Sequence, residues 1–105
     1  MLEKEIEKIL VSEVKKLGGR AYKWVSPGND GVPDRIVIFP NRPPIFVELK
    51  SETGWLSALQ QVQIKRLREL GQAVFVVRGL EGVKVFFEEL GYLDTASNIA
   101  TRYDL

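Results

Sequence analysis

Hydrophobic residues recur at helical spacing close to the amino terminus of this chain. The stripe consists of Ile6, Ile9, Leu10, Val14 and Leu17. Glu and Lys occupy the positions between these residues, and two glycines follow at positions 18 and 19. This spacing predicts an amphipathic helix over residues 2–17 that ends at the glycine pair.

The middle of the chain is rich in short β-branched and aromatic segments, which are typical of strands. The predicted strands are residues 20–25, 35–39, 45–50, 73–77 and 83–87. Residues 26–33 hold two prolines and two glycines and therefore predict a loop. The proline-rich segment 40–44 predicts a hairpin between the strands on either side of it.

A second helix is predicted from Ser57, where Ser-Ala-Leu-Gln forms a capping box, to Leu70 before Gly71. The residues from 88 onward predict a short helix followed by a docked or frayed tail. The expected order is α-β-β-β-α-β-β, an α/β fold with a mixed sheet and a helix on each side. The second helix joins the third and fourth strands, so we expect a right-handed crossover there.

The composition is that of an ordinary soluble protein, with 45% hydrophobic and 28% charged residues in 105. This length predicts one domain over residues 1–105. No apolar run approaches the roughly 20 residues that span a bilayer, and the amino terminus lacks the layout of a signal peptide. With no cysteine there is no disulfide framework, so we expect a cytoplasmic protein that does not engage membranes.

The chain also contains no histidine. Imidazole-based catalytic triads, His-ligated zinc, thiolate chemistry and iron–sulfur clusters are therefore excluded. An enzyme of this composition has to work with carboxylates, lysines, hydroxyls or a hard metal ion held by oxygen ligands. Because the net charge is only +1, any surface that binds nucleic acid must be local.

Three residues of the predicted hairpin form a candidate active site: Asp34, Glu48 and Lys50. Side chains alternate between the faces of a strand, so Glu48 and Lys50 share a face in any register. If Phe39 pairs with Ile45 across the turn, Asp34 lies opposite Lys50 and all three residues share that face.

Two carboxylates at close range repel unless a proton or a divalent cation lies between them. Mg²⁺ is commonly held by one or two carboxylates together with water and phosphate oxygens. Such an ion activates a water molecule for attack on phosphorus, and Lys50 can hold that water or stabilise the phosphate. The alternative is structural: Asp-Pro neighbours are common in turns, and Glu-Leu-Lys also suits the solvated face of an edge strand.

Several short motifs occur in a specific order along the chain. They are Ser26-Pro-Gly28, Gly31-Val-Pro-Asp-Arg35, Val47-Glu-Leu-Lys50, Leu59-Gln60 and Glu3-Lys-Glu-Ile-Glu7. In this order the chain resembles the VRR-NUC domains of the PD-(D/E)xK nuclease superfamily over about residues 3–80. The resemblance implies a restriction-endonuclease-like αβββαβ core and a metal-dependent nuclease.

The resemblance also implies roles for individual residues. Asp34 and Glu48 match the metal-binding carboxylates, and the carbonyl of Leu49 matches a further ligand. Lys50 matches the catalytic lysine. The implied cofactor is Mg²⁺, for which Mn²⁺ is expected to substitute.

Two further site residues are implied by the resemblance. Gln60 matches the helix glutamine beside the site, and helix capping is its alternative role. Glu3 is the best match to a glutamate of the first helix that completes the site. Glu7, one turn further on the same face, is the alternate. For both glutamates a solvated helix face is the structural alternative.

Compact VRR-NUC proteins of this size resemble stand-alone phage nucleases, which implies a homodimer acting on branched DNA such as four-way junctions in a bacterial host. A two-fold dimer matches the symmetry of such a junction. Candidate interface residues are Phe86, Phe87, Leu90, Tyr92 and Leu93. Their alternative role is to complete the core of one subunit.

DNA contact requires basic or polar surface near the site. The candidate DNA-binding residues are Lys23, Ser26, Asn29 and Arg35. Two basic groups are further candidates, for which a solvated surface is the alternative role: Lys15, Lys16, Arg20 and Lys23, and separately Lys65, Arg66 and Arg68. Trp24 and Trp55 are candidates for stacking on bases, although packing in the core or at its rim is the expected role. The competing functions are a non-catalytic nucleic-acid-binding module and a restriction-type or nicking nuclease.

Overall fold

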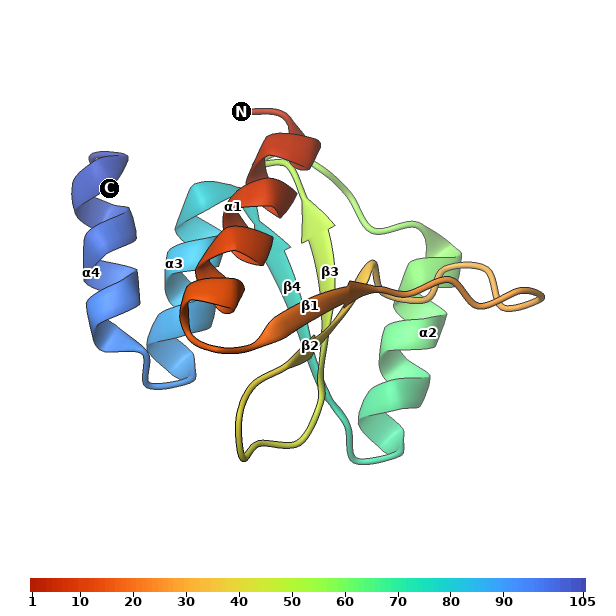
Figure 1. The fold of residues 1–105 in the computed structure, drawn as a ribbon. Coiled ribbons are helices and arrows are strands. Elements are labelled where there is room, and N and C mark those ends of the chain that lie inside the picture. Colours follow the sequence, from red (N-terminus) through yellow and green to blue (C-terminus); the bar gives the residue numbers. More distant parts are fainter.

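The computed structural model describes all 105 residues and shows a mixed sheet flanked by helices on both faces (Figure 1). In chain order the elements are α1 (Glu3–Lys16), β1 (Arg20–Lys23), β2 (Arg35–Ile38), β3 (Ile45–Lys50), α2 (Ala58–Glu69), β4 (Ala73–Arg78), α3 (Gly79–Glu89) and α4 (Leu93–Arg102). The predicted α/β class and the αβββαβ core are confirmed. The two predicted helices are also confirmed, to within about one residue at each end.

The four strands lie side by side in the order β1-β2-β3-β4. β1 pairs with β2 and β2 with β3 in antiparallel fashion, whereas β3 and β4 are parallel. The parallel pair requires a long crossover, which α2 supplies. The sheet is therefore mixed, as the sequence predicts.

The main hydrophobic core lies on one face of the sheet, where α1, α3 and α4 pack. Its strand residues are Val37, Phe39, Ile45, Val47, Leu49 and Val77, and its helix residues are Ile6, Leu10, Val14, Val83, Phe86, Phe87, Ala96 and Ile99. The opposite face is covered only by α2, in which Ile64 is the single buried residue. The helices α1, α3 and α4 thus lie on one side of the sheet and α2 on the other (Figure 1), and the buried residues are concentrated on the first side.

The strand predicted at residues 83–87 is wrong, because these residues belong to α3. The β-branched and aromatic composition favours a strand locally. However, Val83, Phe86 and Phe87 are all buried at spacings of three and four residues, so a helix places all of them in the core. The segment from 88 onward continues α3 and then forms α4. No helix of the structure has both the length and the apolar character needed to cross a bilayer.

The β2–β3 hairpin is confirmed, but its register differs by two residues from the predicted one. Val37, rather than Phe39, pairs with Ile45. Phe39 leaves the ladder and is buried in the core, where its ring lies 4.8 Å from that of Tyr92. Because the shift is even, every side chain keeps its predicted face.

Candidate active site

The candidate site lies at the end of the hairpin where β2 and β3 separate. The ladder between β2 and β3 begins at the pair Arg35 and Val47. β3 continues beyond this pair to Lys50, whereas the segment that precedes β2 turns away at Asp34. Continuing this register places Asp34 beside Glu48 instead of Lys50. Val47 and Leu49 face the core, and by alternation Glu48 and Lys50 project from the other face of β3.

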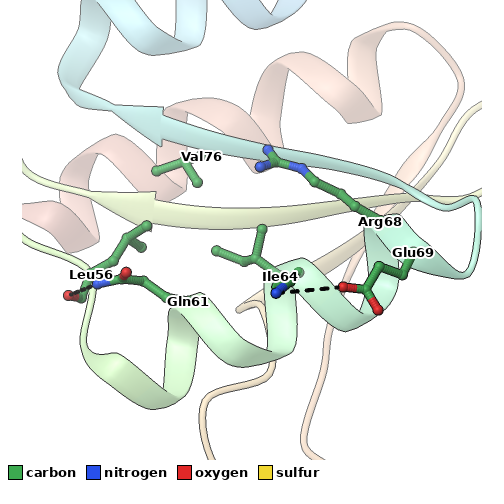
Figure 2. Close-up of a pocket in the computed structure, with 7 residues that line it drawn as sticks. Leu56, Gln61, Ile64, Arg68, Glu69 and Val76 are labelled. Atoms are coloured by element: carbon green, nitrogen blue, oxygen red, sulfur yellow. Dashed lines mark hydrogen bonds and ion pairs between the residues drawn. The ribbon is translucent and has the colours of Figure 1, made fainter.

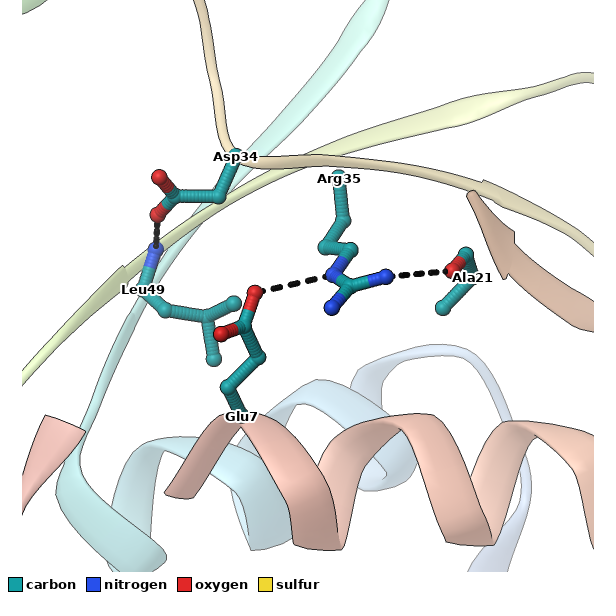
Figure 3. Close-up of polar contacts among 5 residues, drawn as sticks. All are labelled: Glu7, Ala21, Asp34, Arg35 and Leu49. Atoms are coloured by element: carbon teal, nitrogen blue, oxygen red, sulfur yellow. Dashed lines mark hydrogen bonds and ion pairs between the residues drawn. The ribbon is translucent and has the colours of Figure 1, made fainter. Parts of the chain in front are cut away.

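Asp34 is held by main-chain contacts on both sides. The backbone N–H of Leu49 donates to its Oδ2 atom at 2.8 Å, and the backbone N–H of Trp24 donates to its carbonyl oxygen at 2.9 Å. Figure 3 shows the carboxylate reaching across to Leu49 in place of a ladder hydrogen bond. No N–H group donates to Oδ1 of Asp34, which leaves this oxygen to the neighbouring Glu48 carboxyl group or to a ligand.

Glu48 is the most unusual residue of the site, because a carboxylate that is only 1% exposed has no hydrogen-bond partner on either oxygen. Burial, which disfavours the ionised form, raises the pKa of Glu48 from 4.5 to about 8. The neighbouring Asp34 carboxyl group and, to a smaller extent, Glu3 also raise this pKa, and the charge of Lys50 lowers it. Burial of an ionised carboxylate without a partner raises the free energy of the folded state, and a bound cation would offset this increase.

Lys50 is half-buried and forms no hydrogen bond or ion pair. Its stem is covered by the backbone of the β3–α2 connection at Gly54, where a Cβ atom would lie 3.3 Å from both Cβ and Cδ of Lys50. Arg78 donates to the carbonyl oxygen of Gly54 at 3.2 Å and fixes that segment. The aliphatic part of the Lys50 side chain is thus supported by Gly54, and its ammonium group has no partner.

The two candidate glutamates of α1 have different surroundings. Glu7 accepts a hydrogen bond from Nε of Arg35 at 2.8 Å, and Arg35 also donates to the carbonyl oxygen of Ala21 at 2.9 Å (Figure 3). Glu3 is exposed, forms no ion pair and raises the pKa of Glu48. The electrostatic influence of α1 on the site therefore comes from Glu3, while Glu7 and Arg35 join α1 to the sheet.

Gln60 forms the predicted capping box at the start of α2. Its backbone N–H donates to Oγ of Ser57 at 3.1 Å, and its side-chain oxygen accepts from the backbone N–H of Ser57 at 2.9 Å. The loop of residues 26–33 packs against this helix end at Gly31, which has a φ of +87°. A Cβ atom at Gly31 would lie 2.6 Å from the carbonyl carbon of Leu59, so only glycine fits this contact.

The other candidate DNA-binding residues lie at the end of β1, in the loop of residues 26–33 and at the start of β2. The side-chain amide of Asn29 donates to Oγ of Ser26 at 3.0 Å within the exposed loop. Lys23 is exposed at the end of β1 and lies opposite Arg35 in the ladder. Arg35 is half-buried, and its guanidinium group is engaged by Glu7 and the carbonyl oxygen of Ala21.

The two tryptophans are placed differently from each other. Trp24 is half-buried and packs on Phe46 with ring centroids 5.2 Å apart. Trp55 is 88% exposed in the connection that follows Lys50, so its expected packing role is wrong. Phe86 and Phe87, predicted as candidate interface residues, are instead buried in the core, which confirms their alternative role.

The donor groups at the site fit a hard divalent cation. No group of three or more His, Cys, Asp or Glu side chains clusters anywhere in the chain. Asp34 and Glu48 nevertheless provide a free Oδ1 and two buried, unpartnered oxygens. Two carboxylates completed by water and substrate oxygens are a typical Mg²⁺ environment, whereas Zn²⁺ would require His or Cys ligands.

A pocket of about 510 Å³ lies away from the carboxylate site, between α2 and β4 (Figure 2). Its lining includes Leu56, Ile64 and Val76 but none of the candidate site residues. Its basic side chains already have partners, because Arg68 donates to the carbonyl oxygen of Val74 at 2.8 Å and Lys65 lies 3.9 Å from Glu69. This pocket therefore reflects the thin packing beneath α2 and contributes nothing to the carboxylate site.

Comparisons with known proteins found relatives in sequence and in structure. No protein-family model matches the chain. The chain is 52% identical over 75 residues to "Putative nuclease p44" of Acyrthosiphon pisum secondary endosymbiont phage 1, a match that covers 71% of this chain and 81% of the relative. A solved structure described as a VRR_NUC domain superposes with a TM-score of 0.76 at 31% identity, covering 82% of this chain and 94% of that one.

Proposed function

Because the chain belongs to the VRR-NUC family of nucleases, we propose that it is a divalent-metal-dependent, structure-selective DNA endonuclease. A nuclease acts on a nucleic acid, and the proposed substrate is branched DNA such as a four-way junction. One observation carries the proposal: the buried Glu48 carboxylate has no hydrogen-bond partner and lies beside Asp34 and the unpaired Lys50.

The candidate site residues have different roles in the proposed reaction. Asp34 and Glu48, with the carbonyl of Leu49, would hold Mg²⁺ or Mn²⁺. The ion would acidify a water molecule and neutralise charge on the phosphate. Lys50 would hold the attacking water or a phosphate oxygen, a task suited to a compact ammonium group on a flexible stem.

The supporting groups have positioning roles in this proposal. The Leu49 N–H orients the Asp34 carboxylate, and Gly54 supports the stem of Lys50. Glu3 adds negative charge beside Glu48 and would increase the affinity for a cation. Gln60 stands at the start of α2, where the docked loop brings Ser26 and Asn29 into the same region.

The test is cleavage of matched four-way junction, flap and duplex DNAs with Mg²⁺ or Mn²⁺. We expect cleavage that requires the metal and favours the junction, and that is lost in Asp34→Asn and Glu48→Gln. Glu89→Gln is the charge-matched control, because Glu89 is exposed at the end of α3. Cleavage that persists in EDTA or in both site variants would contradict the proposal.

The proposed active species is a homodimer, which would offer one site to each of two strands of a symmetric junction. Most of the segment predicted as the interface packs inside the subunit, although Leu93 remains 64% exposed. Sedimentation at micromolar concentration, combined with mapping of the cut positions on both strands, tests this part. A monomer that nicks one strand would refute the dimer and leave the metal-dependent nuclease intact.

A further inference from the structure

A groove runs along the outer side of α1, next to the start of β2. It encloses about 480 Å³ and is lined by Lys4, Glu7, Lys8, Val11, Ser12, Lys15 and Arg35. The helix residues of this set repeat at intervals of three and four, so they form one stripe of α1. The core residues Ile6, Leu10 and Val14 form a different stripe of the same helix.

The groove carries a strong local positive charge. Four of its side chains are cationic and only Glu7 is acidic, although the whole chain has a net charge of only +1. The charge of Glu7 is taken up by Arg35 at 2.8 Å. Lys4, Lys8 and Lys15 are exposed and none of them forms an ion pair. The three lysines are therefore free to bind an external anion.

The ladder between β1 and β2 extends this positive surface. Lys23 is exposed and lies directly opposite Arg35, so the two side chains share one face of the sheet. Because Arg35 is already paired with Glu7, the cation that this strand adds to the positive surface is Lys23.

The groove also adjoins the candidate active site. Lys4 follows Glu3, whose charge reaches Glu48, and Arg35 follows Asp34. One end of the groove is thus one residue away from the site on both α1 and β2. From Lys4 to Lys15 the helix rises about 16 Å, which corresponds to about five phosphates of one strand along a duplex axis.

We propose that the α1 groove, defined by Lys4, Lys8, Lys15 and Arg35, binds the phosphate backbone of the DNA arm that leads away from the scissile bond. The assignment of the ligand rests on the proposed nuclease function. The lysines act as point charges on the backbone, so the groove positions the substrate without reading its sequence. Ser12, also exposed in the groove, supplies a neutral donor to phosphate oxygens.

The test measures binding in the absence of cleavage. Fluorescence anisotropy of a labelled four-way junction in Ca²⁺ would give the affinity of wild-type protein and of K4Q/K8Q/K15Q over a series of salt concentrations. If the three lysines contact phosphate, the slope of log K against log salt should fall in magnitude by about 2.7, and binding should weaken roughly tenfold or more. The control R42Q/K84Q/R102Q removes the same charge at residues that do not line the groove and should keep most of the slope.

A second measurement locates the contact directly. DNA should protect Lys4, Lys8 and Lys15 from an amine-reactive reagent, read by mass spectrometry, and should leave Lys84, which does not line the groove, unprotected. Equal slopes in the two triple variants, no protection, or no DNA binding by the wild-type protein would overturn the groove.

The outcomes separate the groove from the catalytic proposal. Salt-dependent binding that is lost in K4Q/K8Q/K15Q, by a protein that cleaves nothing, would support the groove and refute the nuclease. Metal-dependent cleavage with unchanged binding in that variant would refute the groove alone.

Discussion

Replacing Glu48 with glutamine should change how the stability of the metal-free protein depends on pH. The folded protein holds a proton on Glu48 up to a pKa of about 8, whereas the unfolded chain releases it near 4.5. Between these values the folded state binds more protons, so its stability falls as pH rises. The contribution of protonated Glu48 is complete below pH 4.5 and is lost as pH rises through about 8.

The size of this effect follows from the same two values. At about 1.4 kcal/mol for each pKa unit, the rise from 4.5 to about 8 corresponds to up to about 5 kcal/mol in the free energy of unfolding. The glutamine side chain of the variant does not titrate, so the difference between wild type and Glu48→Gln isolates this contribution. The buried amide also lacks partners, but its cost is the same at every pH.

The assay is urea unfolding in EDTA at a series of pH values from 5 to 9 for wild type and Glu48→Gln, with Glu89→Gln as control. The wild type should lose stability relative to Glu48→Gln as pH rises, and added Mg²⁺ should restore it at high pH, since an ion bound only by the folded state stabilises that state. If the difference between the two proteins is the same at pH 5 and pH 9, Glu48 is not a buried, uncompensated acid and the reasoning fails.

Three further predictions concern the surroundings of the site. Lys50→Ala should abolish cleavage and retain DNA binding by anisotropy, whereas Lys84→Ala, on α3, should leave both unchanged. Wild-type cleavage by Lys50→Ala would contradict its catalytic role. Gln60→Glu preserves the capping box and should retain the free energy of unfolding while cleavage falls, whereas Gln60→Ala should also lose about 1 kcal/mol of stability in urea. Gly31→Ala should destabilise by more than about 1 kcal/mol and expose the loop to limited proteolysis. Gly28→Ala, at a similar φ of +81° but with no atom within 4 Å of the added Cβ, should cost less, and equal losses would show that the α2 contact is unimportant.

The elements with clear local signals were predicted well from the sequence. The stripe of α1, the Ser57 capping box and the proline-rich hairpin each specify one structure through nearby residues. The segment 83–87 failed because its β-branched and aromatic composition suits a strand, whereas its spacing suits a helix against the core. Burial of Phe86 and Phe87 in the core decides between the two, and the composition of the segment alone does not.

For the site, the sequence correctly predicted that Asp34, Glu48 and Lys50 share a face, because strand alternation is insensitive to an even shift of register. The prediction that Asp34 lies opposite Lys50 is wrong, because the burial of Phe39 lengthens the turn and places Asp34 beside Glu48. The pairing of Glu7 with Arg35 was missed because their contact joins residues 28 positions apart. The α1 groove was also missed, although the spacing of Lys4, Lys8 and Lys15 on one helical stripe was a visible signal.

The unequal packing of the two faces of the sheet implies that the two halves of the site differ in local stability. Asp34, Glu48 and Lys50 are attached to strands whose inner face is sealed by three helices. Gln60 and the loop docked on it depend on α2, whose only buried residue is Ile64. Segments with few buried contacts open first, so amide hydrogen exchange should be faster in α2 than in α1. The strands that carry the carboxylates would then stay folded while α2 and the loop docked on it open. This opening would allow a bulky DNA branch point to enter without unfolding the residues proposed to bind the metal.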